Sequence, residues 1–215
     1  MPSSKRSGFK GLSILITSGP TSVPIDEMRV ITNRSTGEMG RLIANALVAK
    51  GARVTLLEGA VTTSVPVGKI KARKFFEFRE LAGSLRQEIK KKYDWVVHAA
   101  AVSDFEMMKP FRGKVASGKS LTLKLRPTMK LVNDIKRLSP GARLVAFKLE
   151  SSFSGIGSKA AKLFRESKAD LIVANVLSEG EYTAVVLRTD GSATSKVKGK
   201  KELVKVLLEE IDSSV

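Results

Sequence analysis

Five short apolar runs, spread along the 215 residues, constrain the fold of this chain more than any other feature. Each run is continuous in apolar residues and is bounded by turn or helix signals, which is typical of strands buried on both faces of a parallel sheet. Because segments with helical periodicity lie between the runs, the pattern predicts a parallel sheet with right-handed helical crossovers. The expected strands are residues 12–17, 52–59, 95–102, 143–149 and 170–176.

Two of the intervening segments are amphipathic. One helix is expected to start near Ser35 and to present Met39, Ile43 and Leu47 on one face. The other is expected over about residues 76–92, with Leu81 and Leu85 on its apolar face. Helices of this kind cover the faces of a sheet.

The C-terminal part departs from the strand and helix rhythm. An apolar run at 182–188, the dipeptide Asp190-Gly191 and a weaker alternating run predict a β-hairpin. An amphipathic helix with Leu203, Leu207 and Ile211 on one side closes the chain. The predicted fold class is therefore α/β: a Rossmann-like three-layer parallel sheet with a C-terminal antiparallel β-hairpin and a closing helix.

The chain is strongly basic, with 38 Lys and Arg against 21 Asp and Glu and a formal net charge of +17. The excess is spread evenly, because residues 1–110 carry 18 basic and 10 acidic side chains and residues 111–215 carry 20 and 11. A distributed positive field suits small polyanions such as nucleoside triphosphates, and it also attracts nucleic acid weakly and without specificity.

Cysteine is absent, which excludes disulfides, zinc thiolates and cysteine nucleophiles. No apolar run approaches the roughly 20 residues of a membrane-spanning helix. We expect one soluble, cytoplasmic domain over residues 1–215, with residues 1–10 disordered and no membrane partner.

The stretch GKVASGKS at 113–120 matches the phosphate-binding P-loop pattern letter for letter. A P-loop needs a buried strand before it and a helix after it, so that the free N–H groups of the helix hold the phosphates. Here a charged segment broken by Pro110 precedes the match, and the period-two sequence LTLKLRP, a predicted strand, follows it. We interpret the segment as a flexible loop whose Lys114 or Lys119 contacts phosphate.

A better phosphate site is predicted in the long loop after the first strand, TSGPTSVPIDEMRVITNRSTGEMG, residues 17–40. A strand-to-helix loop of this length is uncommon unless it is functional. Ser35 and Thr36 are expected to cap the helix, where hydroxyls and free N–H groups point at a ligand. Gly37 and Gly40 allow a ligand or a strand to approach closely. The alternative without a ligand-binding role is an ordinary capped helix behind a long loop.

Two further signals lie at the ends of predicted strands. In HAAAVSDF, Asp104 is placed to recognise a donor group or a metal, and the small residues from Ala99 to Ala101 let a flat base lie against the backbone. His98, the only histidine, is interpreted as a packed residue. Lys148 stands in an apolar run, where lysine is rarely tolerated without an anionic partner.

These stretches, together with AFKLES and ADLIVANVL, occur in an order and spacing that resemble phosphopantothenate-cysteine ligase of coenzyme A biosynthesis. The resemblance covers about residues 12–212. In many bacteria this domain is fused behind a flavin-dependent decarboxylase, and the chain looks like a stand-alone form.

The resemblance implies a ligase and its reactants. The carboxylate of 4'-phosphopantothenate attacks the α-phosphate of CTP or ATP, pyrophosphate leaves, and the amine of cysteine then displaces the nucleoside monophosphate. Mg²⁺ and a homodimer are also implied. The motifs leave the choice between CTP and ATP open.

The resemblance also implies site residues. Asn33 matches the asparagine that holds the acyl-nucleotide. Lys114 keeps the first lysine of the family motif and is a candidate catalytic residue, but the later, catalytic lysine of the motif falls on Ala116. We infer that Lys148 supplies the charge missing at Ala116. The alternative is a Lys148–Glu150 ion pair on a half-exposed strand end, since the two residues share a face at period two. Nucleotide and phosphate contacts are expected at Gly19, Ser35, Thr36, Gly37, Ala100, Ala101, Asp104, Phe147 and Lys162, and no residue is assigned to a metal.

Two alternatives remain. One is a non-catalytic nucleotide- or nucleic-acid-binding protein on the same fold, suggested by the net charge of +17. Against it stand the lack of an RNA-binding motif and of a G-x-G-x-x-G turn after the first strand. The other is a family member that has lost its activity.

Overall fold

The computed structural model describes residues 8–118 and 120–214. Within them, the main sheet has eight strands in the order β12-β11-β10-β9-β6-β1-β4-β5. The strands from β10 to β5 in this order are parallel, whereas β11 and β12 are antiparallel to their neighbours. The bounds are β1 Ser13–Ser18, β4 Arg53–Glu58, β5 Lys71–Lys74, β6 Trp95–His98, β9 Arg143–Glu150, β10 Leu171–Ser178, β11 Glu181–Arg188 and β12 Val197–Lys198.

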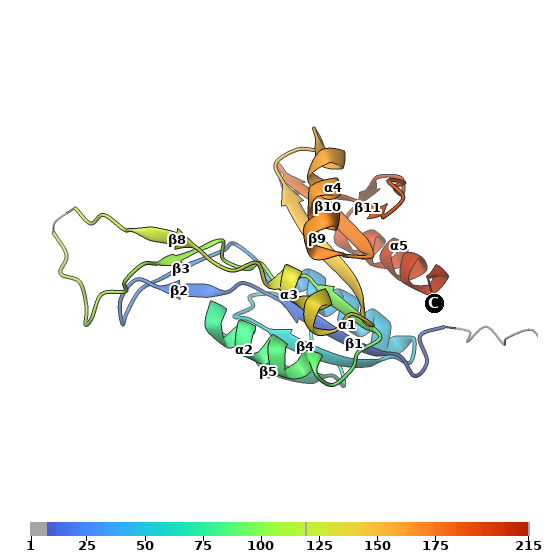
Figure 1. Cartoon of the computed structure of the whole chain (residues 1–215), viewed down its shortest axis with the longest axis horizontal. Coiled ribbons are helices and arrows are strands. Elements are labelled where there is room, and N and C mark those ends of the chain that lie inside the picture. Colours follow the sequence, from blue (N-terminus) through green and yellow to red (C-terminus); the bar gives the residue numbers. More distant parts are fainter. Residues whose placement is uncertain (1–7, 119, 215) are drawn as a thin grey trace, which may run out of the picture.

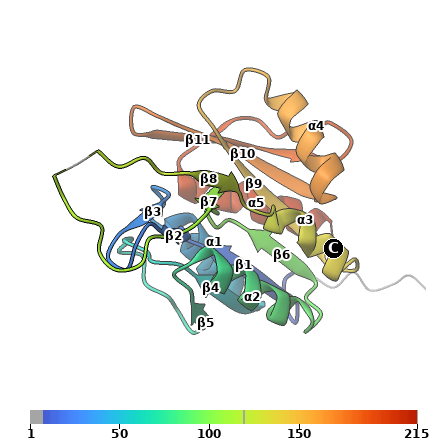
Figure 2. The same ribbon diagram turned by 60° about the vertical axis from the view of Figure 1, so that its left-hand side comes forward.

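All five predicted strands are present and parallel, and helices cover both faces of the sheet (Figure 2). Side chains alternate between two cores along β1: Ile14 and Ile16 face one core and Leu15 faces the other. The first core includes residues of α1 (Glu38–Ala49) and α5 (Lys200–Ser213). The second includes residues of α2 (Phe78–Ile89), α3 (Leu131–Leu138) and α4 (Ile156–Ser167). The predicted three-layer α/β class is confirmed.

A slender projection extends beyond the carboxyl ends of the central strands, to the left in Figure 1. It consists of two small antiparallel hairpins, β2 (Ser22–Pro24) with β3 (Val30–Thr32) and β7 (Phe105–Met107) with β8 (Leu125–Pro127). We call residues 22–32 and 105–127 the arm. Both parts of the arm leave from strands at the centre of the sheet, since the first follows β1 and the second follows β6.

Several local predictions need correction. Helix α1 begins at Glu38 and not near Ser35, because Gly37 takes the N-cap position with a φ of 74° that favours glycine. In the predicted strand after Ser120, only Leu125–Pro127 is a strand, and it pairs within the arm. Of the stretch expected to be disordered, residues 1–7 lie outside the described residues, and Phe9 is packed in the first core with only 2% of its surface exposed.

The C-terminal hairpin is larger than predicted. The chain turns at Asp190-Gly191 as expected, with the Gly191 N–H donating to the Arg188 carbonyl at 3.1 Å. However, the longer antiparallel pair is β10 with β11, which turns through Glu179 and Gly180. Strand β5 was missed, because its four exposed residues, Lys71–Lys74, carry no apolar run. Among the described helices, none has the length and apolarity needed to cross a membrane.

Candidate active site

The order of the strands reverses between β1 and β6, and open α/β sheets bind ligands at such a point, beyond the carboxyl ends of the strands. Main-chain pairing continues here past the ends of both strands. The Ala101 N–H donates to the Gly19 carbonyl at 3.0 Å, and the Thr21 N–H donates to the Ala101 carbonyl at 3.2 Å. The segments after β1 and β6 are therefore joined to each other.

Asn33 returns to this junction from the end of β3. Its side-chain Nδ2 donates to the Ala101 carbonyl at 3.0 Å. The Ala100 N–H donates to Thr17 Oγ1 at 3.2 Å. The fold thus brings together four residues that the sequence assigned to one site: Gly19, Asn33, Ala100 and Ala101.

A pocket of about 490 Å³ lies beside Asn33, and we call it the Asn33 pocket. One part of its wall is polar and includes Asn33, Arg34, Ser35, Thr36 and Thr62, whereas another is apolar. No carboxylate lines it, so the wall suits an anion joined to an apolar group. Its lining residues are Pro20, Ser22, Val30, Thr32, Asn33, Arg34, Ser35, Thr36, Ala60, Thr62 and Phe76.

The N-terminus of α1 lies next to the polar side of this pocket. Its N–H groups and its dipole favour an anion there. Thr36 does not cap the helix as predicted; its Oγ1 accepts a long bond of 3.4 Å from the Glu38 N–H. Ser35 and Thr36 precede the cap and line the pocket directly. They therefore lie just before the helix start and not at its cap, where the sequence predicted them.

Three glycines near the site, Gly19, Gly37 and Gly40, let other segments of the chain approach closely. A Cβ on Gly37 would lie 2.2 Å from Val61 Cγ1, and one on Gly19 would lie 2.9 Å from the same atom. Val61 belongs to the segment that follows β4. A Cβ on Gly40 would lie 2.3 Å from Ser18 Cβ. These glycines let a loop and a strand end pack against α1.

Lys114 lies on the exposed part of the arm, in a segment that the β2–β3 hairpin holds in place. The buried Asp26 carboxylate accepts from the Val115 N–H at 3.0 Å and pairs with Arg29 at 2.6 Å. Arg29 Nη2 also donates to the Val115 carbonyl at 2.6 Å. The Lys114 segment is therefore tied to the tip of the hairpin by Asp26 and Arg29.

The P-loop match is not a P-loop. Pro110 and irregular backbone precede it, the next element is strand β8, and no helix follows before α3. Lys119, one of its two candidate phosphate contacts, lies outside the described residues.

Lys148 is partly exposed and has an anionic partner, as the alternative of a pair with Glu150 expects. Its side chain is 42% exposed at the end of β9 and pairs with Glu150 at 3.2 Å, and Glu150 also pairs with Lys159. These bonds keep the pKa of Glu150 below its usual value, with the Lys159 bond having the largest effect. Phe147 packs partly buried against the first core.

Asp104 and Lys162 do not line the Asn33 pocket. Asp104 pairs with Lys130, and Lys162 on α4 pairs with Glu166 at 3.8 Å. His98 is buried and shares a 2.9 Å hydrogen bond with Thr17, and burial lowers its pKa to about 4. The interpretation of His98 as a packed residue is consistent with this environment.

The side chains do not form a metal site. In the described residues, no three His, Asp or Glu side chains cluster closely enough to hold an ion. Because the Asn33 pocket also lacks a carboxylate, the residues present do not fit a Mg²⁺ held by the protein.

Residues 9–214 match the family model described as the C-terminal domain of DNA/pantothenate metabolism flavoprotein. The chain belongs to this family. It is 37% identical over 210 residues to the coenzyme A biosynthesis bifunctional protein CoaBC of Thermococcus kodakarensis, which covers 95% of this chain and 52% of that protein. It is 34% identical over 171 residues to CoaBC of Bacillus subtilis, covering 78% and 41% respectively. The chain thus spans about half the length of these relatives.

Solved structures agree with this assignment. The DNA/pantothenate metabolism flavoprotein from Streptococcus pneumoniae superposes with a TM-score of 0.84 at 26% identity, covering 95% of this chain and 100% of that one. The C-terminal domain of CoaBC gives 0.79 at 26% identity, covering 96% of each. A Cab2 variant in complex with phosphopantothenate-cysteine gives 0.78 at 18% identity, a likeness of fold, and covers 94% of this chain and 87% of that one. The resemblance to the coenzyme A biosynthesis family is confirmed.

Sequence reasoning missed the segment between β4 and β5, which supplies Ala60 and Thr62 to the pocket, and Phe76 just after β5. A signal was present: GAVTTSVPVGK is a second long loop rich in Gly, Thr and Pro after a buried strand.

The cytoplasmic location expected from the sequence stays a prediction.

The tie between Asp26 and the arm predicts a pH effect. The Arg29 ion pair, followed by the Val115 N–H, holds the pKa of Asp26 well below its usual range. A carboxyl whose pKa is depressed by folding stabilises the protein above its unfolded pKa of about 4, and this stabilisation is lost as the pH falls. Asp26→Asn should therefore lower the melting temperature at pH 7, and its difference from the wild type should shrink between about pH 5 and pH 2. A thermal melt series measures this; a difference independent of pH would contradict it.

Proposed function

We propose that the chain joins 4'-phosphopantothenate to cysteine through an acyl-nucleotide formed from CTP or ATP. The observation that carries this proposal is the Asn33 pocket, with polar groups and a helix N-terminus next to an apolar wall. The substrate has the same two parts, a phosphate and an apolar gem-dimethyl group. Membership in a family whose relatives are named for coenzyme A biosynthesis supports the same choice.

In this proposal, the phosphate of the substrate meets Ser35, Thr36 and the N-terminus of α1, and Phe76 and Val30 pack on its apolar part. The carboxylate at the other end attacks the α-phosphate of the nucleotide, which forms a P–O bond and expels pyrophosphate. The cysteine amine then forms the amide bond as the nucleoside monophosphate leaves, and the amine gives up a proton. Charge neutralisation and positioning carry most of such a reaction.

Nucleotide contacts are proposed at the end of β6 and along β9, where Asp104 and Phe147 lie. Lys114, Lys148 and Lys162 are the candidate cations for its phosphates. The proposed steps rest on these side chains alone, since among the described residues no cluster of His, Asp or Glu could hold Mg²⁺.

Asn33 is the first test. Asn33→Asp keeps the shape of the side chain but places a negative charge beside the proposed anionic intermediate, which should raise the barrier by roughly 2 to 4 kcal/mol. Asn33→Ala also removes the hydrogen bond to Ala101 but adds no charge, so it should remain the faster of the two variants. Pyrophosphate release measured with CTP and with ATP, with phosphopantothenate and with or without cysteine, reports each half-reaction. Wild-type turnover by folded Asn33→Asp would contradict the assignment.

Lys148 is the second test, since a plain ion pair with Glu150 is the competing explanation. Lys148→Met should slow acyl-nucleotide formation by roughly 10²-fold, as expected for the loss of one preorganised charge at a phosphate. The matched control is Lys159→Met, which removes the other cation bound to the same carboxylate. Both variants should keep nearly the wild-type melting temperature, because partly exposed ion pairs contribute little. Equal rates for the two variants would indicate that Lys148 only forms a surface ion pair with Glu150 and has no role in acyl-nucleotide formation.

We also propose that the chain forms a homodimer through the arm. Among the described residues, seven of the twelve large apolar side chains that stay exposed lie in it: Met28, Val30, Phe105, Met108, Phe111, Leu121 and Leu125. An apolar concentration of this kind is typical of a protein contact. Sedimentation velocity should give a dimer for the wild type and a monomer for Met108→Asp, whereas Leu138→Asp, at an exposed position on α3, should stay dimeric. A monomeric wild type would contradict the proposal.

A further inference from the structure

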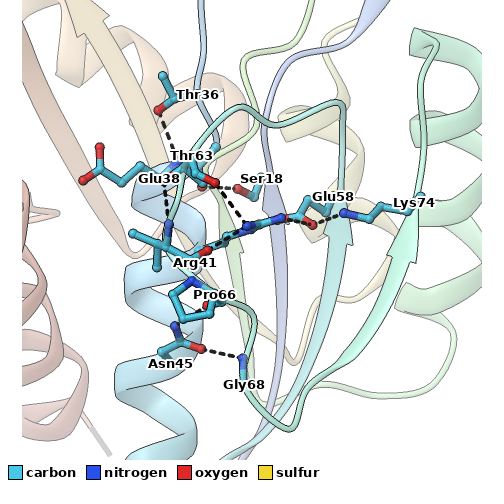
Figure 3. Close-up of polar contacts among 12 residues, drawn as sticks. Ser18, Thr36, Glu38, Arg41, Asn45, Glu58, Thr63, Pro66, Gly68 and Lys74 are labelled. Carbon is cyan, nitrogen blue, oxygen red and sulfur yellow. Dashed lines mark hydrogen bonds and ion pairs between the residues drawn. The ribbon is translucent and has the colours of Figure 1, made fainter.

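The side chain of Glu58 is fully buried at the carboxyl end of β4 and contacts two cations (Figure 3). Arg41 of α1 binds it with both arms of its guanidinium, Nε to Oε1 at 2.6 Å and Nη2 to Oε2 at 3.1 Å. Lys74 at the end of β5 contacts Oε2 from the other side. Three elements thus meet at one carboxylate.

Arg41 also binds the segment that follows β4. Its Nη1 donates to the Val65 carbonyl at 2.7 Å and lies 3.5 Å from the Thr63 carbonyl. One turn further along α1, Asn45 donates to the Pro66 carbonyl at 2.9 Å and accepts from the Gly68 N–H at 3.1 Å. We call residues 59–68 the wall segment. Side chains of α1 thus bind main-chain atoms of the wall segment, as Figure 3 shows.

The wall segment reaches the Asn33 pocket through its first residues. Ala60 and Thr62 line the pocket, and the Thr62 N–H donates to the Thr36 carbonyl at 3.3 Å. On the other side of Glu58, Lys74 leads directly into Phe75 and Phe76, and Phe76 lines the same pocket. Glu58 therefore connects two neighbouring parts of the pocket lining, which leave from the paired ends of β4 and β5, without lining the pocket itself.

The charge on Glu58 is what makes these connections firm. Burial alone would raise its pKa, but the bonds from Arg41 and Lys74 outweigh burial and leave the pKa below its usual value. An ionised buried carboxylate needs its partners in good geometry, because an unpaired buried charge is costly. Moving Arg41 or Lys74 away from Glu58 is therefore unfavourable.

We propose that Glu58, through Arg41 and Lys74, is a positioning residue that sets the wall of the Asn33 pocket and thereby the affinity for the phosphorylated substrate. The inference rests on the proposed function for the identity of the substrate. Its structural part, the ordering of the wall segment, stands on the contacts alone.

The sharpest variant is Arg41→Lys, which keeps the positive charge but loses the guanidinium fork and with it the simultaneous hold on Glu58 and Val65. The KM for phosphopantothenate should rise about tenfold while kcat stays within about threefold, because loss of binding without loss of transition-state contacts acts on KM. The KM for cysteine should not change. Glu58→Gln should act in the same direction.

The matched control is Arg188→Lys. Arg188 binds Glu210 with a similar fork, Nε at 2.7 Å and Nη2 at 2.5 Å, between β11 and α5. Arg188→Lys also loses one bidentate pair, but the pair of Arg188 with Glu210 is more exposed than that of Arg41 with the fully buried Glu58, so this variant should lose less melting temperature. Only Arg41→Lys should change the KM for phosphopantothenate.

Amide hydrogen exchange gives a readout that does not depend on activity, and it applies to every variant that folds. In Arg41→Lys, exchange should speed up by about tenfold or more in the wall segment, while amides of β1 stay protected. Unchanged exchange in the wall segment, or a change of KM equal to that of Arg188→Lys, would overturn the proposal. A different outcome separates the two proposals. If exchange in the wall segment of Arg41→Lys is faster but the wild type does not turn over phosphopantothenate, the proposed function is overturned and the positioning role of Glu58 stays in place.

Discussion

The candidate site depends on main-chain pairing between the ends of β1 and β6. Gly19, Thr21 and Ala101 exchange hydrogen bonds beyond the regular sheet, and the hydroxyls of Thr21 and Ser103 lie 3.0 Å apart just outside them. Both parts of the arm leave the sheet from this junction, and the amide of Asn33 is bound to it. If the junction opened, the pocket would lose one wall and the arm would lose its base. A rigid junction at the switch point therefore lets loops carry chemistry in this fold.

The layers of the fold were predictable because the central strands are buried on both faces. Such strands must be apolar at every position, and that property is visible in the sequence as continuous runs. The edge strand β5 escapes this logic, since Lys71–Lys74 carry three charges and are all exposed. The start of α1 was placed three residues too early, because the sequence offers hydroxyl caps at Ser35 and Thr36 while the backbone uses the left-handed conformation of Gly37. Sequence alone did not distinguish these two ways of beginning a helix.

The pocket residues on one loop were predictable from the sequence, whereas residues that come together only in the folded chain were not. Asn33, Ser35 and Thr36 line one pocket as neighbours in sequence. The sequence left two interpretations of Lys148 open, because a strand end that leaves the core still looks apolar in sequence; in the structure the lysine reaches solvent and Glu150. The wall segment was missed because its role follows from Arg41, Glu58 and Lys74, which come from three separate elements. The spacing of these three residues in the sequence does not indicate that their side chains contact one another.

The pairing of β1 with β6 has a consequence for how the chain folds. Ile14 lies beside Trp95, 81 residues later, so the centre of the sheet closes a long loop. Non-local pairs of this kind slow folding, because loop entropy is lost before the contacts form. During synthesis at about 5 to 20 residues per second, β1 waits roughly 4 to 16 s for β6 to appear. Strand β4, whose Val54 pairs with Ile14, is made first and covers one edge of β1 during that time. The other edge stays open as a site for non-native strand pairing until β6 arrives.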